Sequence, residues 1–305
     1  TGAAGSIGRE LCSQILKFRP AKLIALDQNE TGIFRMERKL KKNFPREKKE
    51  YYIADIYDKD KIDFIFKKEE PEIIFHAAAY KHVPLMEKHP EEAVRNNIFG
   101  TEAVAVAAVK HNVEKLVLIP PDNAVNPTSV MGATKRIGEI LCLFKQNRTK
   151  FCAVRFGNVL DSQGNVIEIF REQIKKGGPV EITNPEMRRY FMVTAEACLL
   201  VMEAGAKSKG GEIFILNMGE PVKILDLAKE MIRLSGCEPD KDVPIVFTKT
   251  RPGEKLFEEL YLKDEVVRMS QDIFILKPKE VDKGNFEKGL YELKKTQENL
   301  ERERI

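Results

Sequence analysis

The sequence lacks several features that mark particular functional classes. No apolar run in its 305 residues approaches the length that spans a bilayer, so no membrane span is expected in this segment. The 51 basic and 47 acidic residues are mixed along the chain, and no basic run with interleaved aromatic residues occurs, which argues against nucleic-acid binding. The four histidines form no H-x-x-H or similar ligand pair, so no metal site is expected.

Cysteine is sparse as well. The five cysteines are scattered singly, without metal-ligand spacing, which predicts reduced and mostly buried thiols in a cytoplasmic protein. With 43% hydrophobic and 32% charged residues, the composition is that of an ordinary globular protein. The length suffices for one large domain or for two unequal domains that share a cleft.

The chain opens on a glycine-rich turn. Gly2, Gly5 and Gly8 have the spacing G-x-x-G-x-x-G and lead into an amphipathic helical pattern. Glycines here let the backbone turn tightly and approach a pyrophosphate, to which the amides at the helix start donate hydrogen bonds. A parallel sheet needs a strand before such a turn. We therefore expect a first strand upstream of Thr1, in a longer polypeptide.

Asp27 follows the next predicted strand, residues 22–26, about 20 residues after the glycines. Dinucleotide-binding folds hold the adenosine ribose hydroxyls with a carboxylate at this place. Such a carboxylate would repel a 2′-phosphate, so NAD is favoured over NADP. The alternative is that Asp27 only caps the next helix.

Strand and helix patterns alternate along the chain, which predicts an α/β fold with a doubly wound, Rossmann-type parallel sheet and right-handed crossovers. We expect an NAD-binding domain over 1–160 and a smaller, mainly substrate-binding domain over 161–305, with about 191–217 packing back on the large domain. The predicted strands are 51–54, 71–75, 115–119, 151–155, 179–183, 211–216 and 244–248, and the predicted helices are 34–44, 91–110, 191–206, 223–235 and a charged tail from about 283.

Candidate site residues follow the predicted strands. Strand 71–75 leads into three alanines, which allow either a flat ligand close to the backbone or tight packing, and then into Lys81 and His82. After strand 115–119, a polar loop leads to a helix with Met131 and Lys135 on one face. This stretch is either an active site at the carboxyl edge of the sheet or an ordinary connection.

Arginines of the second half are candidate phosphate ligands, because a planar guanidinium suits a bidentate grip on phosphate. They are Arg188, Arg189 and Arg251, the last in the turn Arg251-Pro-Gly-Glu254. Surface arginines are common, so none of them by itself indicates a phosphate site.

Together these segments resemble a known family, the extended short-chain dehydrogenase/reductases, and within it the CapD-like UDP-N-acetylglucosamine 4,6-dehydratases of polysaccharide biosynthesis. The likeness covers Gly2 to about Leu262. It rests on segments in the right order: Thr1-Gly-Ala-Ala-Gly-Ser-Ile-Gly8, His76-Ala-Ala-Ala-Tyr-Lys-His-Val-Pro-Leu-Met86, Asn126-Pro-Thr-Ser-Val-Met-Gly-Ala-Thr-Lys-Arg136, Val154-Arg-Phe-Gly-Asn-Val159, Arg189-Tyr-Phe-Met192, Asp226-Leu-Ala228 and Arg251-Pro-Gly-Glu-Lys-Leu-Phe-Glu-Glu-Leu260.

The resemblance implies a redox-neutral dehydration. Bound NAD+ would take a hydride from sugar C4 and return it to C6, while a base removes the C5 proton and an acid assists loss of the C6 hydroxyl. Lys135 would hold the nicotinamide ribose. Met131 stands where the general family has a tyrosine, and it cannot exchange a proton. The CapD-like group shares this methionine, which points to that subgroup and to its retaining product.

The chain departs from this family in the loop before the helix. Related sequences read Ser-Thr-Asp-Lys-Ala where this chain has Pro120-Pro-Asp-Asn-Ala124. Asp122, the acid implied for the C6 hydroxyl, is kept. Pro121 replaces a threonine hydroxyl thought to assist at C4, and Asn123 replaces the lysine expected to act at C5. General base catalysis contributes about 10²- to 10⁴-fold, so slow or absent dehydration is expected.

The resemblance also assigns binding roles and partners. The substrate would be a UDP-N-acetylhexosamine, the protein a cytoplasmic homo-oligomer, and a membrane would be contacted only through a segment upstream of residue 1. A UDP-sugar epimerase and a catalytically silent homologue that binds NAD and a UDP-sugar are the alternatives. The residues implied to contact NAD are Gly2, Gly5, Ser6, Ile7, Gly8, Asp27, Asp55, Ile56, Ala77, Ala79 and Lys135, and those implied near the sugar nucleotide are Lys81, His82, Asn158, Arg189, Arg251 and Glu254.

Overall fold

The computed structural model describes residues 1–120, 125–145, 148–160, 162, 164–261, 267–270, 272–276 and 281–305. Helices and strands alternate through most of this range, as predicted. The helices are α1 Ser6–Lys17, α2 Glu30–Asn43, α3 Lys59–Glu69, α4 Val83–Lys88, α5 Pro90–Ala93, the π-helix η1 Val94–Gly100, α6 Thr101–Lys110, α7 Val130–Phe144, α8 Val166–Lys175, α9 Thr194–Lys207, α10 Ile224–Leu234, α11 Lys283–Glu298 and the short 3₁₀ helix η3 Arg302–Arg304.

The central sheet has the strand order β13-β14-β10-β5-β4-β3. Strands β10, β5, β4 and β3 are parallel, whereas β14 and β13 add an antiparallel hairpin that the sequence patterns do not predict. The strands are β1 Leu23–Asp27, β2 Lys49–Ile53, β3 Ile73–His76, β4 Lys115–Leu118, β5 Lys150–Arg155, β6 Asn158–Val159, β7 Val180–Ile182, β8 Arg188–Arg189, β9 Phe191–Met192, β10 Ile213–Leu216, β11 Val222–Lys223, β12 Ile245–Phe247, β13 Val267–Ser270 and β14 Ile273–Leu276.

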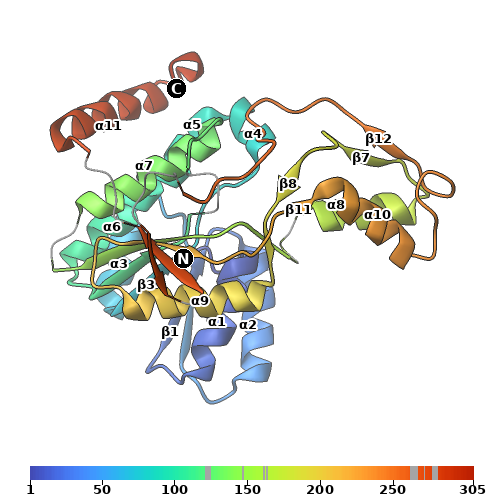
Figure 1. Cartoon of the computed structure of the whole chain (residues 1–305). Helices are drawn as coiled ribbons and strands as arrows, with labels where there is room; N and C mark the ends of the chain where they lie inside the picture. Colours follow the sequence, from blue (N-terminus) through green and yellow to red (C-terminus); the bar gives the residue numbers. More distant parts are fainter. Residues whose placement is uncertain are drawn as a thin grey trace.

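Helices cover both faces of this sheet. Figure 1 shows α1 and α9 on one face and α6 and α7 on the other. Every residue of β4 and β10 is buried, as is usual for parallel strands between two helical layers. The predicted α/β class with a doubly wound parallel sheet is therefore confirmed.

Side-chain caps explain where several helices begin. Asn29 accepts a hydrogen bond from the Gly32 N–H at 2.9 Å and starts α2 four residues earlier than predicted. Ser129 accepts one from the Gly132 N–H at 3.1 Å and fixes the first turn of α7. Such caps satisfy backbone donors that have no partner inside the helix, and each stabilises its helix by about 1 kcal/mol.

A break separates the pair β1–β2 from the central sheet. The Thr1 amino nitrogen donates to the Phe75 carbonyl at 2.8 Å on the β3 side, and the Ala3 N–H donates to the Leu26 carbonyl at 3.1 Å on the β1 side. Behind them lies a cavity of about 380 Å³, lined mainly by apolar side chains of α1, β1, α3 and β3. Residues 1–3 thus bridge the two strand edges. The first strand expected before Thr1 stays a prediction.

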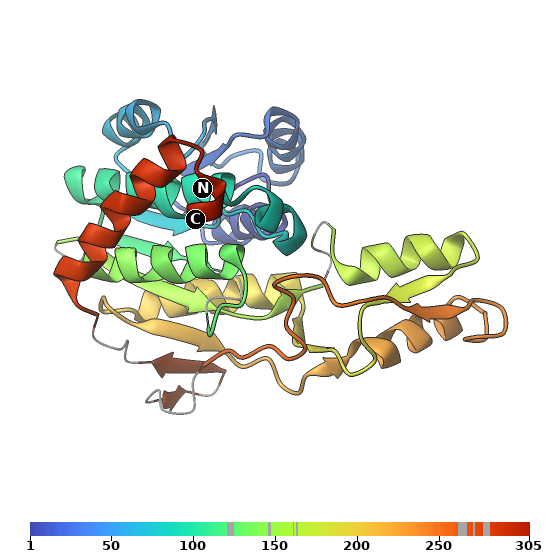
Figure 2. The same cartoon turned by 90° about the horizontal axis from the view of Figure 1, so that it is seen from above.

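A smaller unit with its own core projects from the large sheet (Figure 2). Its core is formed by α8, β7, α10 and their connections, with Phe170, Val180 and Ile232 among the buried residues. Helix α9 packs against α1, and β10 joins the central sheet. The domain bounds expected from the sequence stay a prediction. The hairpin β13–β14 also returns to the sheet, and α11 packs against α7 through the rings of Phe286 and Phe144, whose centroids are 5.2 Å apart.

Candidate active site

The glycine turn, the end of β1 and the end of β3 enclose a cavity of about 140 Å³. This cavity is called the first pocket below. It lies at the carboxyl ends of the parallel strands, where open α/β sheets bind their ligands. Of the residues implied to contact NAD, those that line it are Gly2, Gly5, Asp27, Ile56, Ala77 and Ala79.

The three glycines of the turn have different reasons to lack a side chain. Gly2 has a φ of 65°, and a Cβ atom there would lie 2.6 Å from the backbone of Ala77. A Cβ atom on Gly8 would lie 2.1 Å from the Gly2 carbonyl oxygen. Gly5 has an ordinary φ of −70°, and its Cβ would meet only the Gly2 oxygen, at 3.2 Å. The fold therefore requires Gly2 and Gly8, while Gly5 leaves space beside the first pocket.

Helix α1 presents its N-terminus at the same place. Its N-cap is Gly5, which has no side chain to cap the helix. The amide groups of a first helical turn have no acceptors within the helix, and the helix dipole favours an anion there. Ser6, Ile7 and Gly8, which were predicted to contact the cofactor, form this turn. The arrangement fits a pyrophosphate.

Asp27 faces the first pocket from the end of β1. Its carboxylate accepts hydrogen bonds from the Ala4 N–H at 3.0 Å and the Asn29 N–H at 2.9 Å. The cap of α2 is Asn29, so the alternative that Asp27 merely caps the next helix is wrong. The two backbone donors instead fix the carboxylate at the pocket wall.

Asp55 is not among the residues that line the first pocket, whereas its neighbour Ile56 is. Its carboxylate forms an ion pair with Arg95 at 2.6 Å and accepts a hydrogen bond from the Tyr57 N–H at 2.9 Å. The contact of Asp55 with a cofactor stays a prediction.

Buried polar side chains connect the end of β3 to the helices above it. The His76 ring lies between the hydroxyls of Thr1, at 2.6 Å, and Thr101, at 3.0 Å. Burial lowers the pKa of His76 to about 3. A neutral imidazole therefore joins the glycine turn, β3 and α6 at neutral pH.

The π-helix η1 supplies a second connection. The Asn97 side chain accepts a hydrogen bond from the Tyr80 N–H at 2.8 Å and donates to the Thr134 hydroxyl of α7 at 3.0 Å. No role was predicted for Asn97 from the sequence. The two adjacent asparagines, Asn96 and Asn97, within an apolar helical run could have indicated a buried polar contact. Single π-helical turns are frequent at functional sites. Asn97 fixes the loop after β3 relative to α7.

Met131 and Lys135 both lie on the buried face of α7, with exposed fractions of 0% and 4%. Met131 packs in an apolar cluster with Met86 and Ala93, and Tyr80 lies against this cluster. The thioether is thus buried among apolar side chains, in the position where the general family has tyrosine. Pro121, Asp122 and Asn123 lie outside the described residues.

A buried ion pair anchors α7 one turn further along. The Glu139 carboxylate is fully buried and accepts hydrogen bonds from Arg155 Nε at 2.8 Å and Nη2 at 2.7 Å. Arg155 lies at the end of β5 and also donates to the Leu260 carbonyl at 3.3 Å. This pair was not predicted, because neither side chain belongs to a recognisable spacing. It holds the Lys135 helix against the sheet.

A second pocket of about 320 Å³ lies between the large sheet and the smaller unit. The loop after β3 lines both pockets, since Ala77 to Tyr80 face the first and Lys81 to Pro84 face the second. The two pockets therefore adjoin. Residues predicted to lie near a sugar nucleotide that line this second pocket are Lys81, His82, Asn158, Arg189, Arg251 and Glu254.

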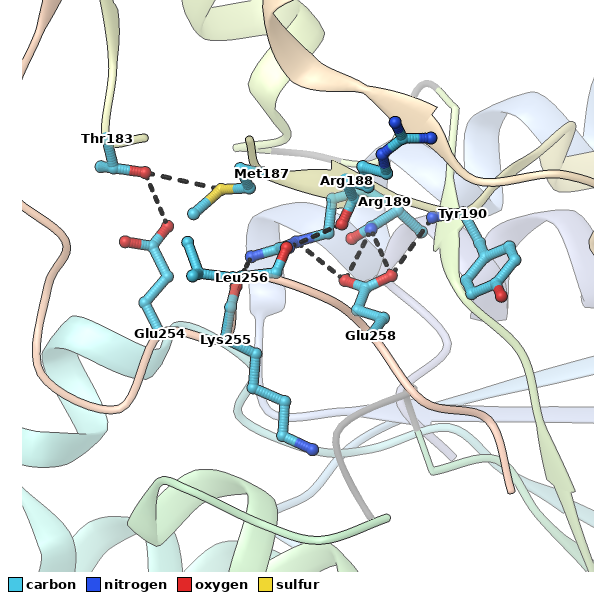
Figure 3. Close-up of polar contacts among 10 residues, drawn as sticks. Thr183, Met187, Arg188, Arg189, Tyr190, Glu254, Lys255, Leu256 and Glu258 are labelled. Carbon is cyan, nitrogen blue, oxygen red and sulfur yellow. Dashed lines mark hydrogen bonds and ion pairs between the residues drawn. The ribbon is translucent and has the colours of Figure 1, made fainter. Parts of the chain in front are cut away.

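The guanidinium nitrogens of Arg189 all bind other groups of the protein. Its Nε lies 3.0 Å from a Glu258 carboxylate oxygen, Nη1 donates to the Arg188 carbonyl at 2.8 Å, and Nη2 donates to the Lys255 carbonyl at 2.7 Å. Figure 3 shows the Glu258 carboxylate against Arg189 and the Tyr190 backbone. With these contacts, Arg189 has no pair of N–H groups that could bind two oxygens of a phosphate. Arg251, which is exposed in the pocket wall, keeps that possibility.

Residues 251–260, called the strap below, join the smaller unit to the start of α7. A Cβ atom on Gly253, whose φ is 76°, would lie 2.8 Å from Ser129 Cβ. The Thr128 hydroxyl donates to the Gly253 carbonyl at 3.2 Å, and Lys255 Nζ donates to the Val125 carbonyl at 2.6 Å. The strap thus forms one wall of the second pocket.

Within the described part of the chain, no helix combines the length and the apolar character that crossing a bilayer requires. The same residues contain no group of three or more His, Cys, Asp or Glu side chains that could hold a metal ion. Four of the five cysteines are buried, and Cys237 is partly exposed.

Comparison with known proteins decides the family. The family model described as "Polysaccharide biosynthesis protein" matches residues 1–278. The chain belongs to this polysaccharide biosynthesis family. Family relatives include the probable polysaccharide biosynthesis protein EpsC of Bacillus subtilis, 55% identical over 87% of this chain and 45% of the relative, and the capsular polysaccharide biosynthesis protein CapD of Staphylococcus aureus, 52% identical over 87% and 45%.

A solved structure shows the same fold. Pen from Bacillus thuringiensis is 35% identical, with a TM-score of 0.83 over 90% of this chain and 85% of Pen. The chain spans about half the length of the curated family relatives it matches. The family assignment confirms the resemblance to CapD-like polysaccharide biosynthesis proteins that the sequence shows.

Proposed function

We propose that this chain is an NAD-dependent UDP-N-acetylhexosamine 4,6-dehydratase whose turnover is slowed by Pro121 and Asn123. One observation carries the proposal. Side chains from the loop after β3, from β6, from β8 and from the strap line a single pocket, which adjoins the pocket of the glycine turn. A dinucleotide and an activated sugar would meet at the loop that separates the two pockets.

The first pocket suits NAD. The Gly5 turn and the α1 N-terminus would receive the pyrophosphate, and Asp27 the adenosine ribose. When bound, the nicotinamide would supply reversible oxidation at C4 and reduction at C6. Lys135 would orient the nicotinamide ribose, and Met131 would exclude water and leave proton transfer to the loop before α7.

The second pocket suits a UDP-sugar. Arg251 is the exposed guanidinium of its wall and would pair with the diphosphate. Asn158, whose amide donates to Glu258 at 3.1 Å, is held at the pocket wall by the strap. Arg189 would act indirectly, by fixing Glu258 and the strap.

Mass spectrometry of a reaction with UDP-N-acetylglucosamine tests the proposal. Slow formation of a product that has lost water is expected, and a variant with Pro121→Thr and Asn123→Lys should form it about 10²- to 10⁴-fold faster. A product of equal mass would mean an epimerase. Binding of both ligands without turnover in either protein would mean a catalytically silent homologue.

A further inference from the structure

The proposed dehydration needs a base at C5 of the sugar. Removal of the C5 proton requires a group that is unprotonated at neutral pH and reaches the sugar. Asn123 has no titratable proton. If the chain turns over at all, another side chain of the second pocket must accept this proton.

Three carboxylates line that pocket. Glu181 is exposed on β7 of the smaller unit, whereas Glu254 and Glu258 are already engaged. Glu258 pairs with Arg189 at 3.0 Å and accepts a hydrogen bond from Asn158. Glu254 accepts hydrogen bonds from the Thr183 hydroxyl at 3.4 Å and the Arg251 N–H at 3.2 Å. Glu254 and Glu258 therefore hold the strap in place, which favours their ionised, hydrogen-bonded state over proton exchange with a substrate.

Four cations line the pocket, and all are poor proton acceptors: Lys81, Arg189, Arg251 and Lys255. Arg189 and Arg251 cannot lose a proton in proteins. Lys255 donates from Nζ to the Val125 carbonyl at 2.6 Å. A lysine ammonium must first lose a proton before it can accept one, whereas a neutral imidazole accepts directly.

His82 has the position that a base for the C5 proton requires. It lines the second pocket at the point where the loop after β3 leaves the first pocket. Its ring edge lies against Gly164, where a Cβ atom would approach His82 Cε1 to 3.0 Å. The side chain does not cap α4, and no residue that the structure describes forms a hydrogen bond with either ring nitrogen.

The charges around His82 favour its neutral form. Partial burial, followed by the positive charges of Lys81 on its own loop and Lys135 on α7, lowers the pKa of His82. The other charged groups nearby are Glu168, which holds the Gly164 N–H, and Arg251 and Glu254 across the pocket. A neutral ring can act as a base, and its conjugate acid can return the proton.

We infer that His82 is the catalytic residue that removes the C5 proton in this chain, in place of the lysine that Asn123 replaces. This inference rests on the proposed function. After oxidation at C4, the C5–H bond breaks and its proton passes to a ring nitrogen of His82. The electron pair forms the C5–C6 double bond as the C6–O bond breaks, and the leaving hydroxyl takes a proton from an acid, for which Asp122 is the candidate. His82 is an exposed residue, so its ring N–H exchanges with solvent. The protonated ring then protonates C5 when C6 is reduced, so the residue ends as it began.

Solvent exchange at C5 tests the inference directly. The full chain is incubated with NAD and UDP-N-acetylglucosamine in D₂O, and deuterium at C5 is measured by NMR. His82→Asn should slow this exchange at least about 10²-fold while the affinities for both ligands change by less than about threefold. Asparagine is a favourable N-cap, so the start of α4 should be kept. Introducing Asn123→Lys into the His82→Asn variant should restore exchange. His89→Asn, a change at the N-cap of α5 outside both pockets, is the matched control and should exchange like the unaltered chain.

A second readout does not depend on turnover. In the ¹⁵N spectrum of the histidine rings, the His82 signals, assigned by their loss in His82→Asn, should shift when UDP-N-acetylglucosamine is added and should titrate below the usual pH of histidine. Equal C5 exchange in His82→Asn and the unaltered chain would overturn the inference. So would exchange that occurs only after Asn123→Lys is introduced. Absence of ligand binding and of product in every variant would instead reject the proposed function, and the role of His82 with it.

Discussion

A comparison of Gly5 with Gly8 distinguishes a glycine that a ligand requires from one that the fold requires. A methyl group at position 5 would meet only the Gly2 carbonyl oxygen, at 3.2 Å, and the backbone φ of −70° suits alanine. Replacing a glycine in such a conformation stabilises a protein by about 0.4–1 kcal/mol, which offsets the tight contact. We therefore expect Gly5→Ala to change the free energy of unfolding by less than about 1 kcal/mol.

The same methyl group would stand between the α1 N-terminus and a pyrophosphate. Loss of one charge-assisted hydrogen bond costs about 1.5–3 kcal/mol, so the Kd for NAD should rise about 10- to 150-fold. Gly8→Ala is the matched comparison, because its methyl group would lie 2.1 Å from the Gly2 carbonyl oxygen and must displace backbone. Its cost should reach about 1–3 kcal/mol or more.

Urea unfolding and calorimetric titration with NAD measure the two quantities separately. The reasoning fails if Gly5→Ala binds NAD as tightly as the unaltered chain, since the space beside Gly5 would then not belong to the cofactor. It fails equally if Gly5→Ala is destabilised as strongly as Gly8→Ala, because the space would then be needed by the fold.

Two further predictions concern buried groups. Folding lowers the pKa of His76 from 6.5 to about 3, so between these pH values the unfolded chain binds more protons than the folded one. The free energy of unfolding should therefore fall as the pH decreases from 6.5 towards 3. His76 should contribute up to about 1.4 kcal/mol per pH unit to this slope. Urea unfolding across this range should show a slope that His76→Gln reduces, and an unchanged slope would contradict the assignment. Glu139→Gln leaves the buried Arg155 guanidinium without its carboxylate and should cost about 3–5 kcal/mol, whereas Glu203→Gln, in an exposed pair with Lys207, should cost less than about 1 kcal/mol. Equal costs in thermal or urea unfolding would show that the Glu139 pair does not anchor α7.

Local patterns in the sequence determined the fold class and much of the candidate cofactor site. The spacing of Gly2, Gly5 and Gly8, the apolar strand before Asp27 and the alternation of strands with helices are all short-range features. The physics behind them acts within a few residues, through backbone sterics, capping and the period of the apolar side chains. This is why the α/β class could be predicted and why strand bounds agree closely, for example 115–119 predicted and Lys115–Leu118 observed.

Only the tertiary structure decided which side chains meet and what each one binds. The sequence left open whether Asp27 caps α2, but the fold gives that position to Asn29 and turns the carboxylate towards the glycine turn. Arg189 was predicted to face phosphate, yet its donors are used by Glu258 and the strap, which lie more than 60 residues away along the chain. The links through Asn97 and through Glu139 and Arg155 join helices and strands that no spacing rule relates. Ion pairs and hydrogen bonds of this kind form between surfaces that come together only when the chain has folded, so their partners depend on packing rather than on local sequence.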